Sequence, residues 1–156
     1  MQRLNLPEYD FRITRDNNKL KIFDVFRKKF LVLTSEEWVR QNFLTWLVKE
    51  KQYPQSLISV ESGLKYNTLQ KRSDAIIFNR NAQPAILIEF KAPSVELDND
   101  TIKQILSYNY SIKAPYLIIT NGLQHYCLKM NKTEKRFDFL QEIPDFNKLI
   151  EDVASI

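Results

Sequence analysis

The sequence predicts a mixed α/β fold, a central mixed sheet flanked by helices, with extra β structure at both ends. Two observations carry this prediction. Two segments with helical periodicity, 34–51 and 97–113, enclose three strand-like segments and are followed by a fourth, which gives the order helix, three strands, helix, strand. The strand-like segments are rich in Ile, Leu and Phe, as buried strands are.

The 156 residues are enough for one domain with its own core, so we expect a single domain over 1–156, with the core at about 34–130. The two glycines, Gly63 and Gly122, stand far apart, which excludes a glycine-rich phosphate loop and therefore a P-loop nucleotide hydrolase. The single cysteine, Cys127, excludes an internal disulfide. With no signal peptide and no membrane-length apolar run, the chain is expected to be cytoplasmic and without a membrane partner.

The N-terminal part, about 10–33, is expected to form a β hairpin or meander. Residues 11–14 and 20–33 are strand-like, and the sequence RDNNK between them is typical of a turn. The helix that follows has Thr34 as its N-cap and Glu37 three residues later, the pattern of a capping box.

Three strands are then expected at 57–62, 73–79 and 85–92, the last two joined by the hairpin loop NRNAQP. The helix at 97–113 has Asp98, Asn99 or Asp100 as its cap. After it we expect a strand at 115–122 that ends in an Asn-Gly turn, strands at 123–130 and 136–141, and a short helix at 143–154.

Charged residues interrupt the strand PAILIEFKAPS. Glu89 and Lys91 are two residues apart, so they share one face of the strand, while Ile88 and Phe90 occupy the other. If Phe78 pairs with Ala85, paired residue numbers sum to 163, and Asp74 lies opposite Glu89. Two carboxylates would then project side by side with an ammonium group one step away.

Two adjacent carboxylates repel each other, and a divalent cation relieves that repulsion. Mg²⁺ prefers oxygen ligands and often binds through one or two carboxylates together with phosphate oxygens. Such an ion would activate water, and Lys91 would orient that water or offset negative charge. The alternative, which is common for a Glu-x-Lys tripeptide, is a solvated cross-strand ion pair.

The pattern of Asp74 followed by Glu89-Phe90-Lys91 after a hairpin resembles the PD-(D/E)XK nuclease superfamily, and the element order matches its αβββαβ core. QILSY places Gln104 and Tyr108 in the Q-x-x-x-Y arrangement of RecB-like members. Together with KRSDAIIF, LIEFKAP and TNG, the chain looks like the N-terminal nuclease domain of type I restriction enzyme R proteins in a short stand-alone form, over roughly residues 20–130.

The resemblance implies roles for individual residues. Asp74 and Glu89 would be metal ligands, with the carbonyl of Phe90 as a possible third, and Lys91 would be the catalytic lysine. A further acidic ligand from the first helix falls on Glu36 or Glu37. Supporting or DNA-contacting roles fall on Gln104, Tyr108, Arg40 and Arg72.

Each supporting residue also has a structural interpretation. Glu37 would close the capping box, Arg40 would pair with Glu37, and Tyr108 would pack in the core. Arg72 would lie in a solvated loop. The chain departs from the resemblance where Arg72-Ser73 stand in place of the proline that names the superfamily, and it has no helicase motor.

The sequence therefore predicts a Mg²⁺-dependent DNA endonuclease, in which Mn²⁺ substitutes for Mg²⁺. Its expected partners are DNA, other restriction-system subunits and a second copy of the chain. The alternatives are a nucleic-acid-binding or interaction module of a restriction or repair complex without useful turnover, and a plain structural protein whose ion pairs lie on the surface.

Overall fold

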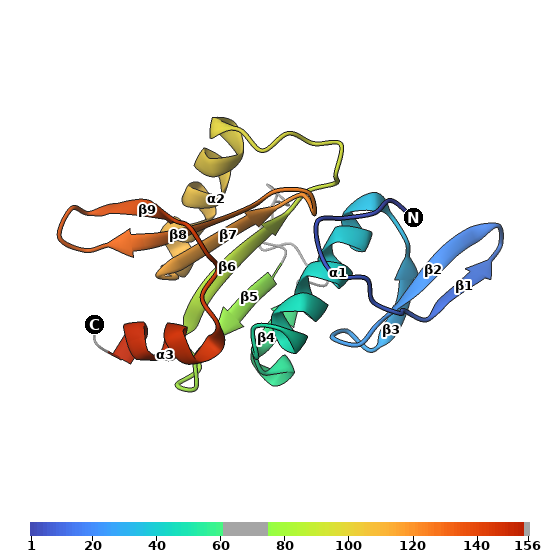
Figure 1. The fold of residues 1–156 in the computed structure, drawn as a ribbon, viewed down its shortest axis with the longest axis horizontal. Coiled ribbons are helices and arrows are strands. Elements are labelled where there is room, and N and C mark those ends of the chain that lie inside the picture. The colour runs from blue at the N-terminus through green and yellow to red at the C-terminus, as the bar shows by residue number, and fades with distance from the viewer. Residues whose placement is uncertain (61–74, 155–156) are drawn as a thin grey trace.

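The computed structural model describes residues 1–60 and 75–154 and shows a mixed α/β fold with two sheets (Figure 1). An antiparallel three-stranded sheet has the order β1-β2-β3, and a six-stranded sheet has the order β4-β5-β6-β7-β8-β9. The elements are β1 (Ile13–Asp16), β2 (Lys19–Asp24), β3 (Lys29–Val32), α1 (Ser35–Lys49), a 3₁₀ turn η1 (Gln55–Leu57), β4 (Ile58–Val60), β5 (Ala75–Phe78), β6 (Pro84–Phe90), α2 (Asn99–Ile112), β7 (Tyr116–Thr120), β8 (His125–Asn131), β9 (Arg136–Leu140) and α3 (Phe146–Ala154).

The N-terminal strands form a meander, as the sequence predicts. Asn17 and Asn18 link β1 to β2 and have φ angles of 50° and 63°, which asparagine tolerates better than most residues. The turn is therefore shorter than the RDNNK stretch, because Arg15 and Asp16 belong to β1. This sheet lies at one end of the molecule, beyond α1, and the β8–β9 hairpin lies at the opposite end (Figure 1).

The predicted order of helix, three strands, helix, strand is confirmed by α1, β4, β5, β6, α2 and β7. β4, β5 and β6 pair antiparallel, and β6 then pairs parallel with β7. A parallel pair needs a crossover connection, and α2 supplies it. The carboxyl ends of β6 and β7 consequently lie at the same edge of the sheet.

The predicted β5–β6 register holds for most of the hairpin. Ala75 pairs with Ile88 and Ile77 with Ile86, so the paired numbers sum to 163. The assumed Phe78–Ala85 pair is wrong, because the register shifts after Ile77 and Phe78 faces Pro84. An extra residue in one strand shifts the pairing by one on the loop side and leaves the pairs from Ala75 to Ile77 in the predicted register.

Helices cover both faces of the six-stranded sheet. Phe43 and Leu47 of α1 and Leu149 of α3 belong to one buried cluster, which also contains Ile88 and Phe90 of β6. Ile105 of α2 belongs to the other cluster, with Leu87 and Ile119. From Ile86 to Phe90, the alternation along β6 therefore places odd-numbered side chains under α2 and even-numbered ones under α1 and α3.

Asp98 caps α2, which settles the choice among the three predicted caps. Its side chain accepts the Thr101 N–H at 3.1 Å, and this bond lowers the pKa of Asp98 below its usual value. The Asp98 backbone N–H donates in turn to the Thr101 hydroxyl at 3.4 Å, which completes a capping box. In the described part of the chain, no helix combines the length and the apolar character that crossing a membrane requires.

Candidate functional site

The candidate site lies where β6 ends. The parallel ladder continues one residue past the strand, since the Lys91 N–H donates to the Thr120 carbonyl at 2.9 Å. This bond fixes the backbone that carries Glu89 and Lys91. Glu89 and Lys91 are two and four residues after Leu87 along the extended chain. Their side chains therefore lie on the same side of the sheet as Leu87, the side that α2 covers.

Glu89 and Lys91 meet on the face that the sequence predicts for them. The Lys91 ammonium lies 3.3 Å from Oε2 of Glu89 and donates a hydrogen bond of 3.1 Å to Oε1 of Gln104 on α2. Glu89 is 5% exposed, although it is a carboxylate. A charge this deep in a sheet is retained only with partners. The solvated ion pair is therefore not what the structure shows.

Gln104 and Tyr108 occupy successive turns of α2. Gln104 reaches the site and contacts Lys91. Tyr108 is half-buried and packs against the core on the α2 side of the sheet, which matches the structural interpretation of its role.

Glu37 lies at the start of α1 among cationic and amide groups. Its backbone N–H donates to the Thr34 hydroxyl at 3.0 Å, so Thr34 is the predicted N-cap. The capping box is wrong, because the Thr34 N–H donates to Val32 instead. The Glu37 carboxylate accepts hydrogen bonds from Arg27, Arg40 and Gln41.

Arg40 pairs with Glu37, as the sequence predicts, and it also reaches Glu36 at 3.1 Å. Arg40 is only 8% exposed, and its guanidinium lies 5.4 Å from the ring centroid of Phe90. This contact joins the start of α1 to the end of β6. It places Arg40 inside the protein, in a supporting position.

Three members of the cluster around Glu37 were not predicted from the sequence: Gln41, Arg27 and Asp24. Asp24 is fully buried and pairs with Arg27, which also binds Glu37 at 2.8 Å. Strand alternation could have identified Asp24. It is two residues after Ile22 in β2, so both side chains lie on the same face, and Ile22 is fully buried. An aspartate at an inward position of a strand requires a cationic partner.

Asp74 and Arg72, which the sequence places in or beside the site, lie outside the described residues. Among the residues at 1–60 and 75–154, no three His, Cys, Asp or Glu side chains form a group that could hold a metal ion. The described part of the site is thus Glu89, Lys91 and Gln104, with Glu37 and Arg40 supporting the strand end from the other face.

Comparisons with known proteins agree with this fold. Residues 35–144 match the family model described as "Type I restriction enzyme R protein N terminus (HSDR_N)". A solved fragment assigned to an HsdR subunit of a type I restriction enzyme from Vibrio vulnificus YJ016 is similar, with a TM-score of 0.56 and 18% sequence identity. The alignment covers 79% of this chain and 26% of that chain, and at this identity it concerns the fold alone. The search of curated proteins gave no match.

Proposed function

Because the chain belongs to the family of type I restriction enzyme R protein N-terminal domains, we propose that it is a metal-dependent endonuclease domain that hydrolyses phosphodiester bonds in DNA. Its α1-β4-β5-β6-α2-β7 order would then be a PD-(D/E)XK core. The observation that carries the proposal is the contact of Glu89 with Lys91 at the carboxyl end of β6, where Gln104 restrains the lysine.

The donor atoms at this edge fit a hard divalent cation. Glu89 offers a buried carboxylate, and its neighbour Phe90 has a backbone carbonyl at the strand end. Mg²⁺ and Mn²⁺ both favour such oxygen ligands. The proposal further requires the carboxylate of Asp74, which lies outside the described residues, to join Glu89. A bound cation would polarise the phosphoryl group and lower the pKa of a coordinated water.

In this proposal Lys91 is the catalytic lysine, and its contacts support that role. Its ammonium is held between the Glu89 carboxylate and the Gln104 amide oxygen, and its side chain keeps 20% exposure. It can therefore approach a substrate phosphate while its partners limit its motion. In the proposed reaction Lys91 orients the attacking water and offsets the negative charge that develops on the phosphate. Gln104 acts through Lys91 and is a positioning residue.

A second candidate is a nucleic-acid-binding module without turnover, and Glu37 favours it. In the nuclease hypothesis Glu37 supplies a further metal ligand. Its carboxylate instead binds Arg27, Arg40 and Gln41, so it would have to leave these partners to reach a metal. A site with only Asp74 and Glu89 would bind the cation more weakly.

Supercoiled plasmid distinguishes the two candidates. The protein is incubated with plasmid and Mg²⁺ or Mn²⁺, in parallel with the variants Asp74→Asn, Glu89→Gln and Lys91→Met. A matched control is Lys103→Met, an exposed lysine of α2 next to Gln104. We expect nicking by the protein and by the control, and a loss of about 100-fold or more in the site variants. Cleavage that persists in all three would overturn the assignment, and binding without cleavage in either metal would favour the second candidate.

The proposed partners follow from the same function. The chain spans 26% of the solved fragment that it resembles, so the activities of a whole R protein do not transfer to it directly. Cutting both strands of a duplex requires two sites. We propose that a second copy of the chain or another restriction-system subunit supplies the second one. Sedimentation of the protein with and without a duplex would show whether DNA brings two copies together.

A further inference from the structure

The positive charge of the chain is concentrated in the three-stranded sheet. Residues 12–33 contain seven Lys or Arg and two Asp, a net charge of +5. The whole chain is +4, so the remainder is net −1. The family match begins at residue 35, so this sheet precedes it. The proposed nuclease site therefore does not account for the basic sheet.

The two faces of this sheet differ. One face contains Ile22 and Asp24, both fully buried, and Asp24 is joined through Arg27 to Glu37 of α1. Every residue of the other face is exposed or half-buried. We call this second face the aromatic face; its residues are Arg12, Thr14 and Asp16 from the β1 side, Lys19, Lys21 and Phe23 of β2, and Phe30 and Val32 of β3.

The aromatic face has an ordered centre. Phe23 and Phe30 are cross-strand partners with ring centroids 5.2 Å apart and an interplanar angle of 70°. The Arg12 guanidinium lies 5.1 Å from the Phe23 centroid and 5.2 Å from that of Phe30. Phe30 is nevertheless 36% exposed. Two rings and a planar cation thus present π surfaces to solvent at a fixed place.

Cations surround this centre. Lys19 and Lys21 lie on the same face as Phe23, and Asp16 is its one acidic residue. Asp16 pairs with Lys21 at 3.0 Å, which leaves the ammonium of Lys19 and the Arg12 guanidinium as positive charge on this face. Arg15, Lys28 and Lys29 add exposed positive charge elsewhere on the sheet.

We propose that the aromatic face binds single-stranded nucleic acid. Bases would stack on Phe30 and on the Arg12 guanidinium, and the Lys19 ammonium would contact phosphate. Single strands are the expected ligand because their bases are free to stack on the protein, whereas the bases inside a duplex are already stacked on one another. An acidic protein would satisfy the lysines but would make no use of the exposed rings.

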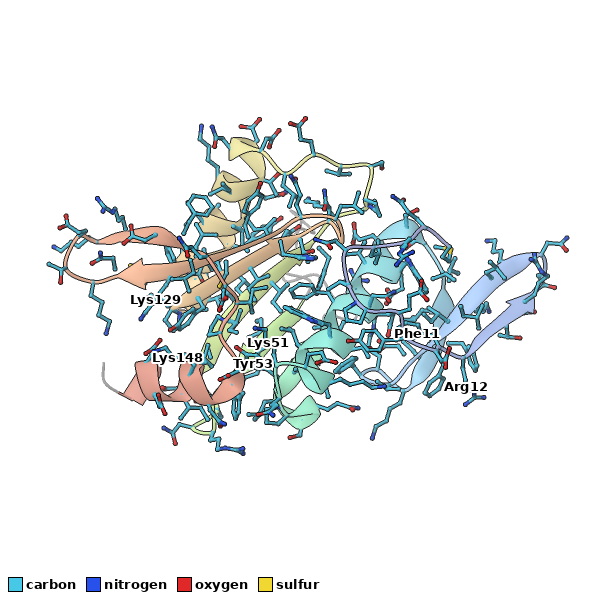
Figure 2. The ribbon with its side chains drawn as sticks, in the orientation of Figure 1. Phe11, Arg12, Lys51, Tyr53, Lys129 and Lys148 are labelled. Carbon is cyan, nitrogen blue, oxygen red and sulfur yellow. The ribbon has the colours of Figure 1, made fainter. Side chains whose placement is uncertain are left out.

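This surface is separate from the candidate nuclease site. Glu89 and Lys91 lie on the side of the six-stranded sheet that α2 covers. Arg12 (Figure 2) lies on the three-stranded sheet, beyond α1, which covers the opposite side of the six-stranded sheet. The proposal does not depend on cleavage, because stacking and phosphate contacts need no metal. Binding is therefore measured in EDTA, which removes the metal that cleavage requires. A failure to bind there would count against this proposal alone, and a failure to cleave with Mg²⁺ would count against the nuclease proposal alone.

The test is fluorescence anisotropy with labelled oligo-dT and oligo-U of about 12 nucleotides, a length within the range that one single-strand module covers. A duplex of the same length is measured beside them. The full chain is compared with Phe30→Leu, which keeps an apolar side chain but removes the ring, and with Lys19→Gln. Lys148→Gln, whose side chain is 63% exposed on α3, is the matched charge control.

We expect the single strands to bind at least about fivefold more tightly than the duplex, and Phe30→Leu to weaken them by about fivefold or more, with an unchanged salt slope. Lys19→Gln should lower the slope of log K against log salt by about 0.7 for oligo-dT. Lys148→Gln should change neither. Circular dichroism checks that each variant is folded.

Equal affinity for duplex and single strand would overturn the proposal, and so would a folded Phe30→Leu variant that binds as the parent does. Absence of binding at low salt would also overturn it. Preference for oligo-dT over oligo-U, or the reverse, would identify the natural ligand as DNA or RNA, and either result supports single-strand binding.

Discussion

The ammonium of Lys91 donates to the side-chain oxygen of Gln104 at 3.1 Å, which joins the end of β6 to the second turn of α2. Glu89 contacts the same ammonium at 3.3 Å. The lysine is therefore held by one charged and one neutral acceptor from two different elements. Removal of the neutral acceptor leaves the charge pair intact and tests the orientation of Lys91 alone.

Gln104→Leu should impair the proposed nuclease through Lys91. The leucine is similar in size but accepts no hydrogen bond, so the ammonium would sample more positions. We expect plasmid nicking to fall by about 10- to 100-fold, and the free energy of unfolding to change by only about 1 kcal/mol. Gln104→Glu restores an acceptor and should recover much of the lost rate. Equal loss in both variants would argue that the amide itself contacts substrate.

Glu37→Ala should destabilise the protein far more than Glu36→Ala. The Glu37 side chain is 7% exposed and binds two arginines, whereas Glu36 is 41% exposed and binds one. Without Glu37, the guanidinium groups of Arg27 and Arg40 lose a shared counter-charge inside the protein. We expect a cost of about 3–5 kcal/mol for Glu37→Ala and about 0–1 kcal/mol for Glu36→Ala.

Urea unfolding measures both free energies. If the two variants lose similar stability, the buried cluster does not hold the start of α1 as the contacts indicate. Glu37→Gln provides a milder comparison, since the amide keeps the shape of the side chain but removes its charge.

The sequence predicts the order of the elements and much of the candidate site because these depend on local patterns. Strand alternation is enough to place Glu89 and Lys91 on one face, and helical periodicity gives α1 and α2. The sequence does not single out Asp98 as the cap of α2, because Asn99 and Asp100 have equally suitable side chains. The cap is fixed by the residue at which the helical backbone begins, and α2 begins at Asn99.

The pairing of Glu37 with Arg27 could not be predicted from α1 alone. Arg27 comes from the β2–β3 turn, ten residues earlier, and reaches Glu37 only after the N-terminal sheet has folded onto the helix. The bulge after Ile77 was missed for a similar reason, because it depends on how the following loop closes. The hydrophobic periodicity of a sequence reports local structure, so it does not predict long-range partners or the geometry of a loop.

His125 should make the protein less stable as the pH falls. Its Nε2 donates to the Asn5 carbonyl at 3.1 Å, so Nδ1 is the atom that accepts from the Thr120 hydroxyl at 2.7 Å. Burial is the main cause that lowers the pKa of His125 below its ordinary 6.5. The ring stacks on Trp46 and therefore ties residue 5 to α1 and β8.

The sign follows from proton binding. Below about pH 6.5 the unfolded chain protonates His125 while the folded protein still holds it neutral, so the unfolded state gains stability. The free energy of unfolding should therefore fall between about pH 7 and pH 5, and His125→Gln should show a flatter profile. The neighbours Asn5, Trp46 and Thr120 do not titrate, so a profile unchanged by the substitution would place the pH dependence elsewhere.

Gly122→Ala should destabilise the β7–β8 turn. Gly122 has a φ of +86°, and a Cβ there would lie 2.8 Å from Cδ2 of Leu4 and 3.1 Å from Cγ2 of Val39. The backbone strain and the contact with Val39 on α1 together should cost about 1–3 kcal/mol in urea unfolding.

The double variant Gly122→Ala/Leu4→Ala tests whether crowding against Leu4 adds to this cost. Leu4→Ala alone removes a mostly buried side chain, but it also removes the nearest atoms to the new Cβ. If crowding contributes, the double variant should lose less stability than the sum of the single losses, because the two sites share a contact. Strict additivity would assign the effect of Gly122→Ala to its backbone angle and to the contact with Val39, since neither of these depends on Leu4.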